Sequence, residues 1–109
     1  MPYNLELARR IRIQIGSLAG LEEKKVFGGV GFLLNGNMAC GVNQENLVVR
    51  LDPKRSEDAL AKPHVKPFSM GSRSMAGWIV VSPQGCKNDE DLKTWIREGI
   101  DYSGFLPPK

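Results

Sequence analysis

Long hydrophobic runs are missing from this sequence. Its apolar stretches are short, such as residues 78–81, whereas a membrane-spanning helix needs about 20 apolar residues. The first positions soon reach Glu6, Arg9 and Arg10, so they lack the apolar segment of a signal peptide. The sequence therefore predicts a cytoplasmic protein.

Cysteine and histidine are also scarce, with two cysteines and one histidine. They do not follow any ligand spacing typical of zinc, and a reducing compartment disfavours a disulfide between Cys40 and Cys86. We expect both thiols to be structural. His64 lies between prolines without a neighbouring carboxylate, which favours an exposed loop; a binding contact or a pH-sensitive role is the alternative. We expect no bound metal and no cofactor.

Motifs for catalysis are absent as well. The glycines at 28–31 lead into a predicted strand and lack a following Lys-Ser/Thr pair, so they favour a bulge or a close backbone approach over phosphate binding. A Gly-x-Ser-x-Gly nucleophile motif does not occur. Glu22-Glu23 is expected in a solvated turn, and the acids at 89–91 at a helix start. We predict that the protein is not an enzyme.

What the sequence does contain is typical of an ordinary globular protein. Its 109 residues, 41% hydrophobic and 25% charged, predict a single domain over residues 1–109. The net charge of +3 is small compared with that of dedicated nucleic-acid modules.

The N-terminal half predicts one helix and three strands. Apolar residues at helical spacing indicate a helix from about Asn4 to Gly16. Asn35-Gly36 between apolar runs is a strong hairpin signal and pairs strands at 31–34 and 37–42. After a polar turn, a third strand is expected at 47–51.

The next segment predicts a short helix and a fourth strand. We expect a helix capped by Ser56 and running through Ala61, then extended chain at 63–67 and a loop at 70–76. The continuous apolar run at 77–81 favours a strand buried on both faces, hence a central one. Phe68 is expected to pack over the sheet, and exposure as an anchor for a partner is the alternative.

Asn88 opens the last predicted helix, and residues 102–109 are expected to form an extended tail. The fold class is therefore α+β, with an antiparallel sheet of about four strands and the N-terminal and C-terminal helices packed on it. The apolar stripe of the last helix comprises Leu92, Trp95, Ile96 and Ile100.

Basic residues are the best candidates for an interaction site. They could gather into one patch for an acidic protein or a phosphate backbone, or they could form ordinary solvated faces. Arg50 interrupts an apolar strand, where a salt bridge or an outward position is expected. The candidate residues are Arg9, Arg10, Arg12, Arg50, Lys54, Arg55, Lys62, His64, Lys66 and Arg73.

Other readings remain open from the residues alone. A small ligand could bind at His64, Arg50 and the glycine-rich strand. An exposed strand edge could also pair two copies into a homodimer.

Several motifs in order resemble one family. They are the runs 23–32, 36–42, 49–51 and 63–68 with Met70, then Gly77-Trp78, Trp95 and residues 106–109. Together they resemble the TfoX N-terminal domain, which occurs in regulators of competence for DNA uptake (transformation). The resemblance implies a transcription-associated accessory domain whose partner is a cyclic-AMP-responsive transcription activator. Full regulators of this kind carry a second, C-terminal domain, whereas the motifs found here resemble the first domain alone. A stand-alone N-terminal domain is therefore expected. It supplies no catalytic residues.

Overall fold

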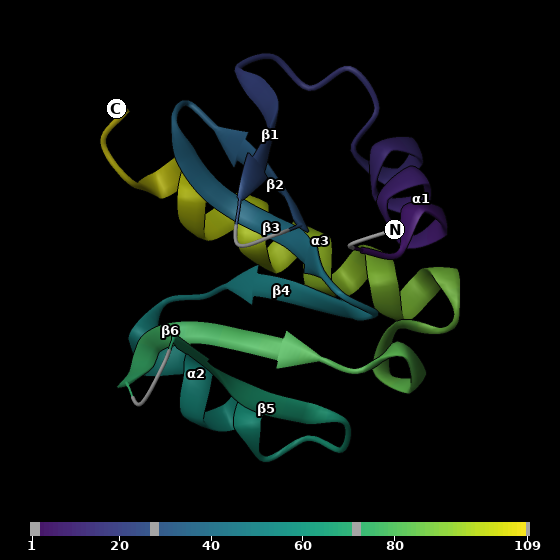
Figure 1. Ribbon diagram of the computed structural model, residues 1–109. Helices are drawn as coiled ribbons and strands as arrows, with labels where there is room; N and C mark the ends of the chain where they lie inside the picture. The colour runs from purple at the N-terminus through teal and green to yellow at the C-terminus, as the bar shows by residue number, and fades with distance from the viewer. Residues whose placement is uncertain (1–2, 27–28, 71–72, 109) are drawn as a thin grey trace.

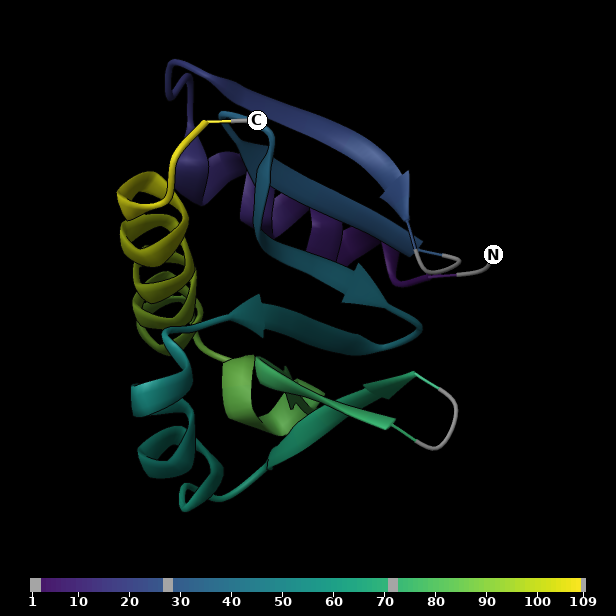
Figure 2. The ribbon, with the colours of Figure 1, turned by 90° about the vertical axis from the view of Figure 1, so that its left-hand side faces the viewer.

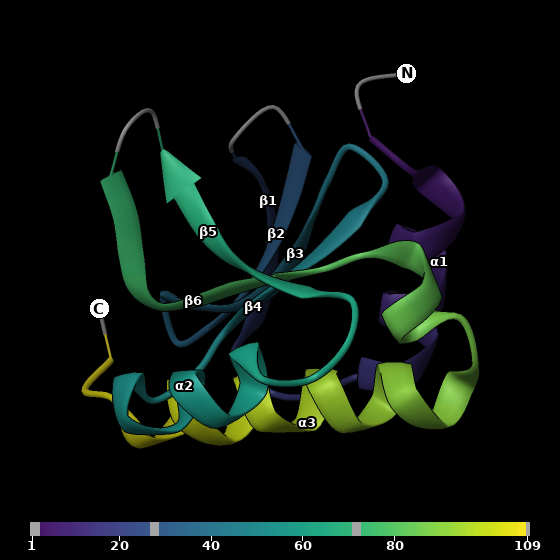
Figure 3. The ribbon, with the colours of Figure 1, turned by 90° about the horizontal axis from the view of Figure 1, so that it is seen from below.

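Three α-helices lie against one face of a six-stranded antiparallel sheet (Figures 1 and 3). The computed structural model describes residues 3–26, 29–70 and 73–108. The strands follow the order β1-β2-β3-β4-β6-β5. Along the chain the elements are α1 (Leu5–Ile15), β1 (Leu21–Val26), β2 (Gly29–Leu34), β3 (Asn37–Asn43), β4 (Asn46–Arg50), α2 (Pro53–Leu60), β5 (Val65–Met70), β6 (Arg73–Val81), the 3₁₀ turn η1 (Pro83–Cys86) and α3 (Asp89–Phe105).

The α+β class is confirmed, with six strands in place of about four. The Asn4 side chain caps α1 by accepting from the Leu7 amide, because the first amides of a helix lack partners within it. The β2–β3 hairpin turns at Asn35 and Gly36, where φ is 53° and 86°. These positive angles are those of a type I′ turn. β6 lies between β4 and β5, so its predicted central position is confirmed.

Two strand regions differ from the prediction. β1, with the sequence Leu-Glu-Glu-Lys-Lys-Val, contains Glu22-Glu23, which we expected in a turn. It is an edge strand whose four central residues are exposed, so no alternation of apolar residues marks it. The predicted loop at 70–76 is mostly strand, because β5 extends to Met70 and β6 begins at Arg73. Residues 71–72 lie outside the described part of the chain.

The helix ends also required correction. Asp52, and not Ser56, caps α2, and Pro53 occupies its first turn; proline suits this position because its missing N–H would be unpaired there anyway. Ser56 lies within the helix and donates from its hydroxyl to the Pro53 carbonyl. Asn88 caps α3 as predicted. The helix continues to Phe105, so only the last few residues are extended.

The helix-covered face of the sheet carries the main core. Phe32, Val49 and Ile79 pack there with Ile11 of α1 and Leu92 of α3. The opposite face has a smaller cluster of Met38, Val48 and Phe68, with Trp78 partly buried beside it. Phe68 is therefore packed on the sheet, as expected, and its ring centroid is 6.2 Å from that of Trp78.

α3 runs beneath the middle of the sheet (Figure 3). A Cβ atom at Gly99 would lie 2.3 Å from the Ala39 carbonyl oxygen of β3. Only glycine allows the helix backbone to approach the strand this closely. None of the helices in the described residues is sufficiently long and apolar to cross a bilayer.

Replacing Gly99 by alanine should therefore destabilise the protein. We expect Gly99→Ala to lower the free energy of unfolding by about 2 kcal/mol, because the obstructing atom is backbone and the helix must shift. Gly104→Ala is the control on the same helix, since its Cβ would meet only a Leu34 methyl group at 3.3 Å. Urea denaturation measures both; equal stability of the two variants would contradict the close-approach argument.

The α1–β1 contact should respond to acid. Arg12 donates to both carboxylate oxygens of Glu23 at 2.7 Å, which lowers the pKa of Glu23 below its ordinary value of 4.5. This pair stabilises the fold above pH 4.5, and its contribution is lost as the pH falls through the lowered pKa. We expect the urea midpoint of Arg12→Gln to fall less steeply than that of wild type in this acid window. Lys66→Gln, on an exposed residue of β5, should keep the wild-type slope; identical slopes in all three proteins would count against the prediction.

Candidate functional site

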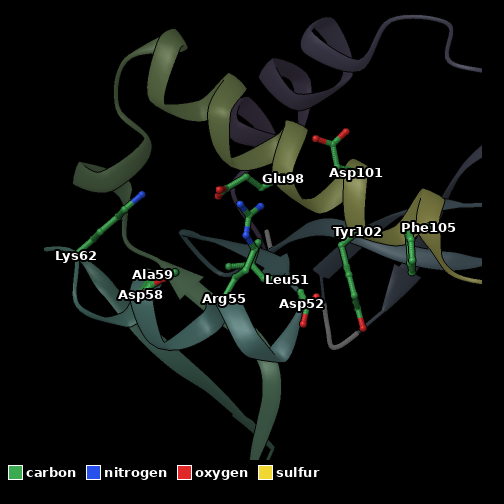
Figure 4. Close-up of a pocket in the computed structure, with 10 residues that line it drawn as sticks. All are labelled: Leu51, Asp52, Arg55, Asp58, Ala59, Lys62, Glu98, Asp101, Tyr102 and Phe105. Atoms are coloured by element: carbon green, nitrogen blue, oxygen red, sulfur yellow. The ribbon is translucent and has the colours of Figure 1, made fainter.

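A groove of about 430 Å³ separates α2 from the C-terminal half of α3 (Figure 4). Leu51 and Ala59 form part of its apolar floor, and the α3 wall carries Tyr102 and Phe105. The Phe105 side chain is 85% exposed, more than any other large hydrophobic residue described. An exposed aromatic residue at the rim of a hollow is typical of a surface that contacts a partner.

Carboxylates outnumber cations in this groove. Asp58, Glu98 and Asp101 line it together with Asp52, whereas the basic lining residues are Arg55 and Lys62. Asp52 is occupied as the cap of α2. Within the described chain, the other three acids form no ion pair within 4.0 Å. The protein carries a net charge of +3, so this acidic groove differs in sign from the molecule as a whole.

The two groove cations lie away from the Phe105 end of the groove (Figure 4). The Lys62 ammonium group lies 5.1 Å from the centroid of the Trp95 ring, a cation–π contact. Arg55 extends from α2 toward Glu98 of α3 (Figure 4). The end of the groove at Tyr102 and Phe105 is therefore apolar and acidic.

Arg50, the last residue of β4, stands between two aromatic rings. Its guanidinium carbon is 5.4 Å from the Trp78 ring centroid and 5.7 Å from that of Tyr102. Of the two expected alternatives for Arg50, the salt bridge is not found among the described residues, and the side chain is half-buried. Arg50 thus makes cation–π contacts with both rings and links β4 to Tyr102 at the groove wall.

The three arginines of α1 are paired within the protein. Arg9 binds Glu6 and Arg12 binds Glu23. Arg10 donates from one nitrogen to the carbonyls of Cys86 and Lys87 and to the Asp89 carboxylate, at 3.0–3.1 Å. These guanidinium groups connect α1 to its surroundings, and their charge is largely compensated.

The other predicted cations lie around α2 and β5. Lys54 and Lys66 are exposed there with Arg55 and Lys62, and Arg73 begins β6, although its side chain lies outside the described part of the structure. α1 and α2 lie at opposite ends of the sheet (Figures 1 and 2). The structure thus separates the candidate basic residues into two groups.

His64 is exposed in the turn before β5, where its φ is 67° and its carbonyl accepts from the Ser82 amide. It lies at the Val81 end of β6, whereas Arg50 pairs with Trp78 at the other end of the β4–β6 ladder. The structure therefore does not bring His64 and Arg50 together. The glycine-rich strand β2 is also separated from β6, by β3 and β4.

The cysteines and glycines have structural positions. Cys40 is fully buried, which raises the pKa of its thiol to about 12, and burial also raises the pKa of Cys86. Thiols of this kind stay protonated and unreactive. A Cβ atom at Gly29 would lie 1.9 Å from the Val42 carbonyl oxygen, so the predicted close backbone approach is confirmed there. Gly28 lies outside the described residues. No cluster of three or more potential metal ligands occurs in the described chain.

Sequence reasoning missed the groove. Its two walls come from segments about 40 residues apart, and their packing is not visible in the sequence. Tyr102 and Phe105 were assigned to an extended tail, although the helical spacing that begins at Leu92 continues through Ser103. That continuation was the available signal.

Comparison with known families gives one match. The model of the TfoX N-terminal domain matches residues 14–103, from the end of α1 almost to the end of α3. Searches of curated proteins and of solved structures each found no match. The matched segment includes the whole sheet, α2 and most of the groove. The chain therefore belongs to the TfoX N-terminal domain family.

Proposed function

We propose that this protein is a non-enzymatic regulatory domain of the competence type, and that it acts by binding a transcription activator. The observation that carries the proposal is the family match over residues 14–103. It supports a competence-related regulatory role at the level of the family. The non-enzymatic part of the proposal agrees with the burial of both cysteines and with the separation of His64 from Arg50.

The α2–α3 groove is the proposed contact surface. Its occupant is a basic segment of the activator, with an apolar residue placed against Phe105. Charge supports this choice, because Asp58, Glu98 and Asp101 form no ion pair with described residues. Opposite charges across an interface accelerate association and exclude partners of the wrong sign. The exposed aromatic ring supplies the apolar contact that charge alone does not.

Binding through the basic residues to nucleic acid is the weaker alternative. The arginines of α1 are already paired with acids, and α2 intersperses Lys54 and Arg55 with Glu57 and Asp58. If these basic residues bound phosphates, the affinity for nucleic acid would fall steeply with salt concentration through counterion release.

Reversing a charge in the groove should weaken activator binding. We expect Asp58→Lys to raise the Kd for the cyclic-AMP-responsive activator about tenfold, because it replaces an attraction by a repulsion. Glu57→Lys is the matched control, since Glu57 lies on the same helix, is also exposed and does not line the groove. Titration calorimetry with purified, nuclease-treated proteins measures both constants.

Removing the exposed ring should have a similar effect. Phe105→Ala is expected to raise the same Kd about tenfold by loss of an aromatic anchor, with little change in unfolding free energy because the side chain is 85% exposed. Ile13→Ala removes another exposed apolar side chain, 64% exposed on α1, and should bind as wild type does.

The outcomes separate the partner from the surface. If wild type binds the activator and all four variants bind equally well, the activator is the partner but the groove is not its contact surface. If wild type fails to bind the activator but binds DNA in a salt-dependent manner that Lys54→Glu or Lys66→Glu abolishes, the nucleic-acid alternative replaces the proposal. If neither binds, the activator is not the partner.

A further inference from the structure

The two edges of the sheet are built differently. At one edge, β5 contains Pro67, which has no N–H to donate, and its register with β6 shifts between Pro67 and Ser69. Prolines and bulges hinder the addition of another strand. At the other edge, β1 pairs with β2 over all six residues without a shift or a proline. β1 forms the outer rim of the molecule in Figure 2. It is therefore the edge that can accept a strand.

The backbone of β1 offers hydrogen-bonding groups to that side. The Asn35 amide donates to the Gly20 carbonyl, and hydrogen-bonded pairs alternate along an antiparallel ladder. Glu22 and Lys24 therefore bond to β2, whereas the peptide groups of Glu23 and Lys25 point outward. The peptide group of Leu21 also points outward, but its amide donates at 3.4 Å to the Leu18 carbonyl. The free N–H groups of this edge are therefore limited to the residues after Leu21.

Symmetry restricts how a second copy could pair there. Paired residues of an antiparallel ladder lie on the same face of the sheet, and side chains alternate between the two faces along each strand. A two-fold axis perpendicular to the sheet can therefore relate two identical strands only where a residue pairs with its own copy. We propose that β1 pairs with β1 of a second copy of this protein, antiparallel, with the two-fold axis at Glu23.

The charges of β1 complement those of its own copy in this register. Glu22 faces the partner's Lys24, and Lys24 faces the partner's Glu22, at positions where facing side chains are closest. Within one strand, the Lys24 ammonium nitrogen already lies 3.7 Å from a carboxylate oxygen of Glu22. The four side chains form a ring of alternating charge on the face of the sheet opposite the helices.

The one like-charge contact is compensated. Glu23 faces the partner's Glu23, but each carboxylate accepts two hydrogen bonds from Arg12 of its own chain. Moving the axis to Lys24 or to Glu22 would instead place two lysines or two glutamates directly opposite, in the more closely spaced type of pair. Like charges at such positions are unfavourable. An axis at Lys25 would place two lysines opposite each other, and Lys25 forms no ion pair with a described residue. Charge therefore selects the register centred on Glu23.

The expected dimer is weak, because one short strand pair buries less than the roughly 1,200 Å² of stable interfaces. Sedimentation equilibrium from micromolar to millimolar protein is the measurement. Wild type should show a monomer–dimer equilibrium. Glu22→Lys and Lys24→Glu should each raise its dissociation constant about tenfold, and the double variant should restore the wild-type value because it exchanges the two charges. Lys66→Glu, on the protected β5 edge, should have no effect.

A second experiment tests the register. Residues facing each other across the axis have Cα atoms about 5.5 Å apart, which suits a disulfide. Glu23→Cys should therefore form a crosslinked dimer on oxidation, while Lys25→Cys, which faces the partner's Leu21, should not. Cys40 and Cys86 are buried and should not interfere. Wild type that stays monomeric throughout, or single charge reversals that dimerise like wild type, would overturn the proposal; crosslinking through Lys25→Cys alone would overturn the register.

Discussion

The close approach of α3 to the sheet at Gly99 is the constraint on which the rest of the structure depends. Because this helix backbone lies against the Ala39 carbonyl, Leu92 and Ile96 are buried between α3 and the central strands. The C-terminal half of the same helix carries Tyr102 and Phe105. These residues face the groove that remains between α3 and α2, which packs against β6. One helix thus forms both the middle of the core and a wall of the candidate site.

Local signals were sufficient where the physical cause is local. Asn4 and Asn88 were recognised as helix starts because a side-chain acceptor before an apolar helical pattern is typical of a cap. Asn35-Gly36 indicated the central hairpin because both residues tolerate positive φ angles. β1 was missed because the residues that point to either face of this edge strand are exposed, so apolar and polar residues do not alternate along it. Its pairing is determined by β2, a partner that the pattern of β1 itself does not indicate.

The candidate site was harder to predict than the fold. A small positive net charge directed attention to the arginines, yet pairing in three dimensions assigns Arg9, Arg10 and Arg12 to neighbouring acids and carbonyls. Glu98 and Asp101 were not singled out for the same reason: sequence shows which charges exist and not which remain unpaired. Only the packing of α2 beside α3 places Asp58, Glu98 and Asp101 around one hollow.

The two proposed surfaces depend on the family to different degrees. The groove is built from α2 and α3, nearly all of which lie within the matched residues 14–103. The register proposed for β1 also needs Arg12, because without it two glutamates would face each other uncompensated across the axis. Arg12 belongs to α1, most of which precedes the matched segment. Self-pairing of β1 therefore does not follow from family membership: it depends on a helix and an ion pair that must be established in each chain separately.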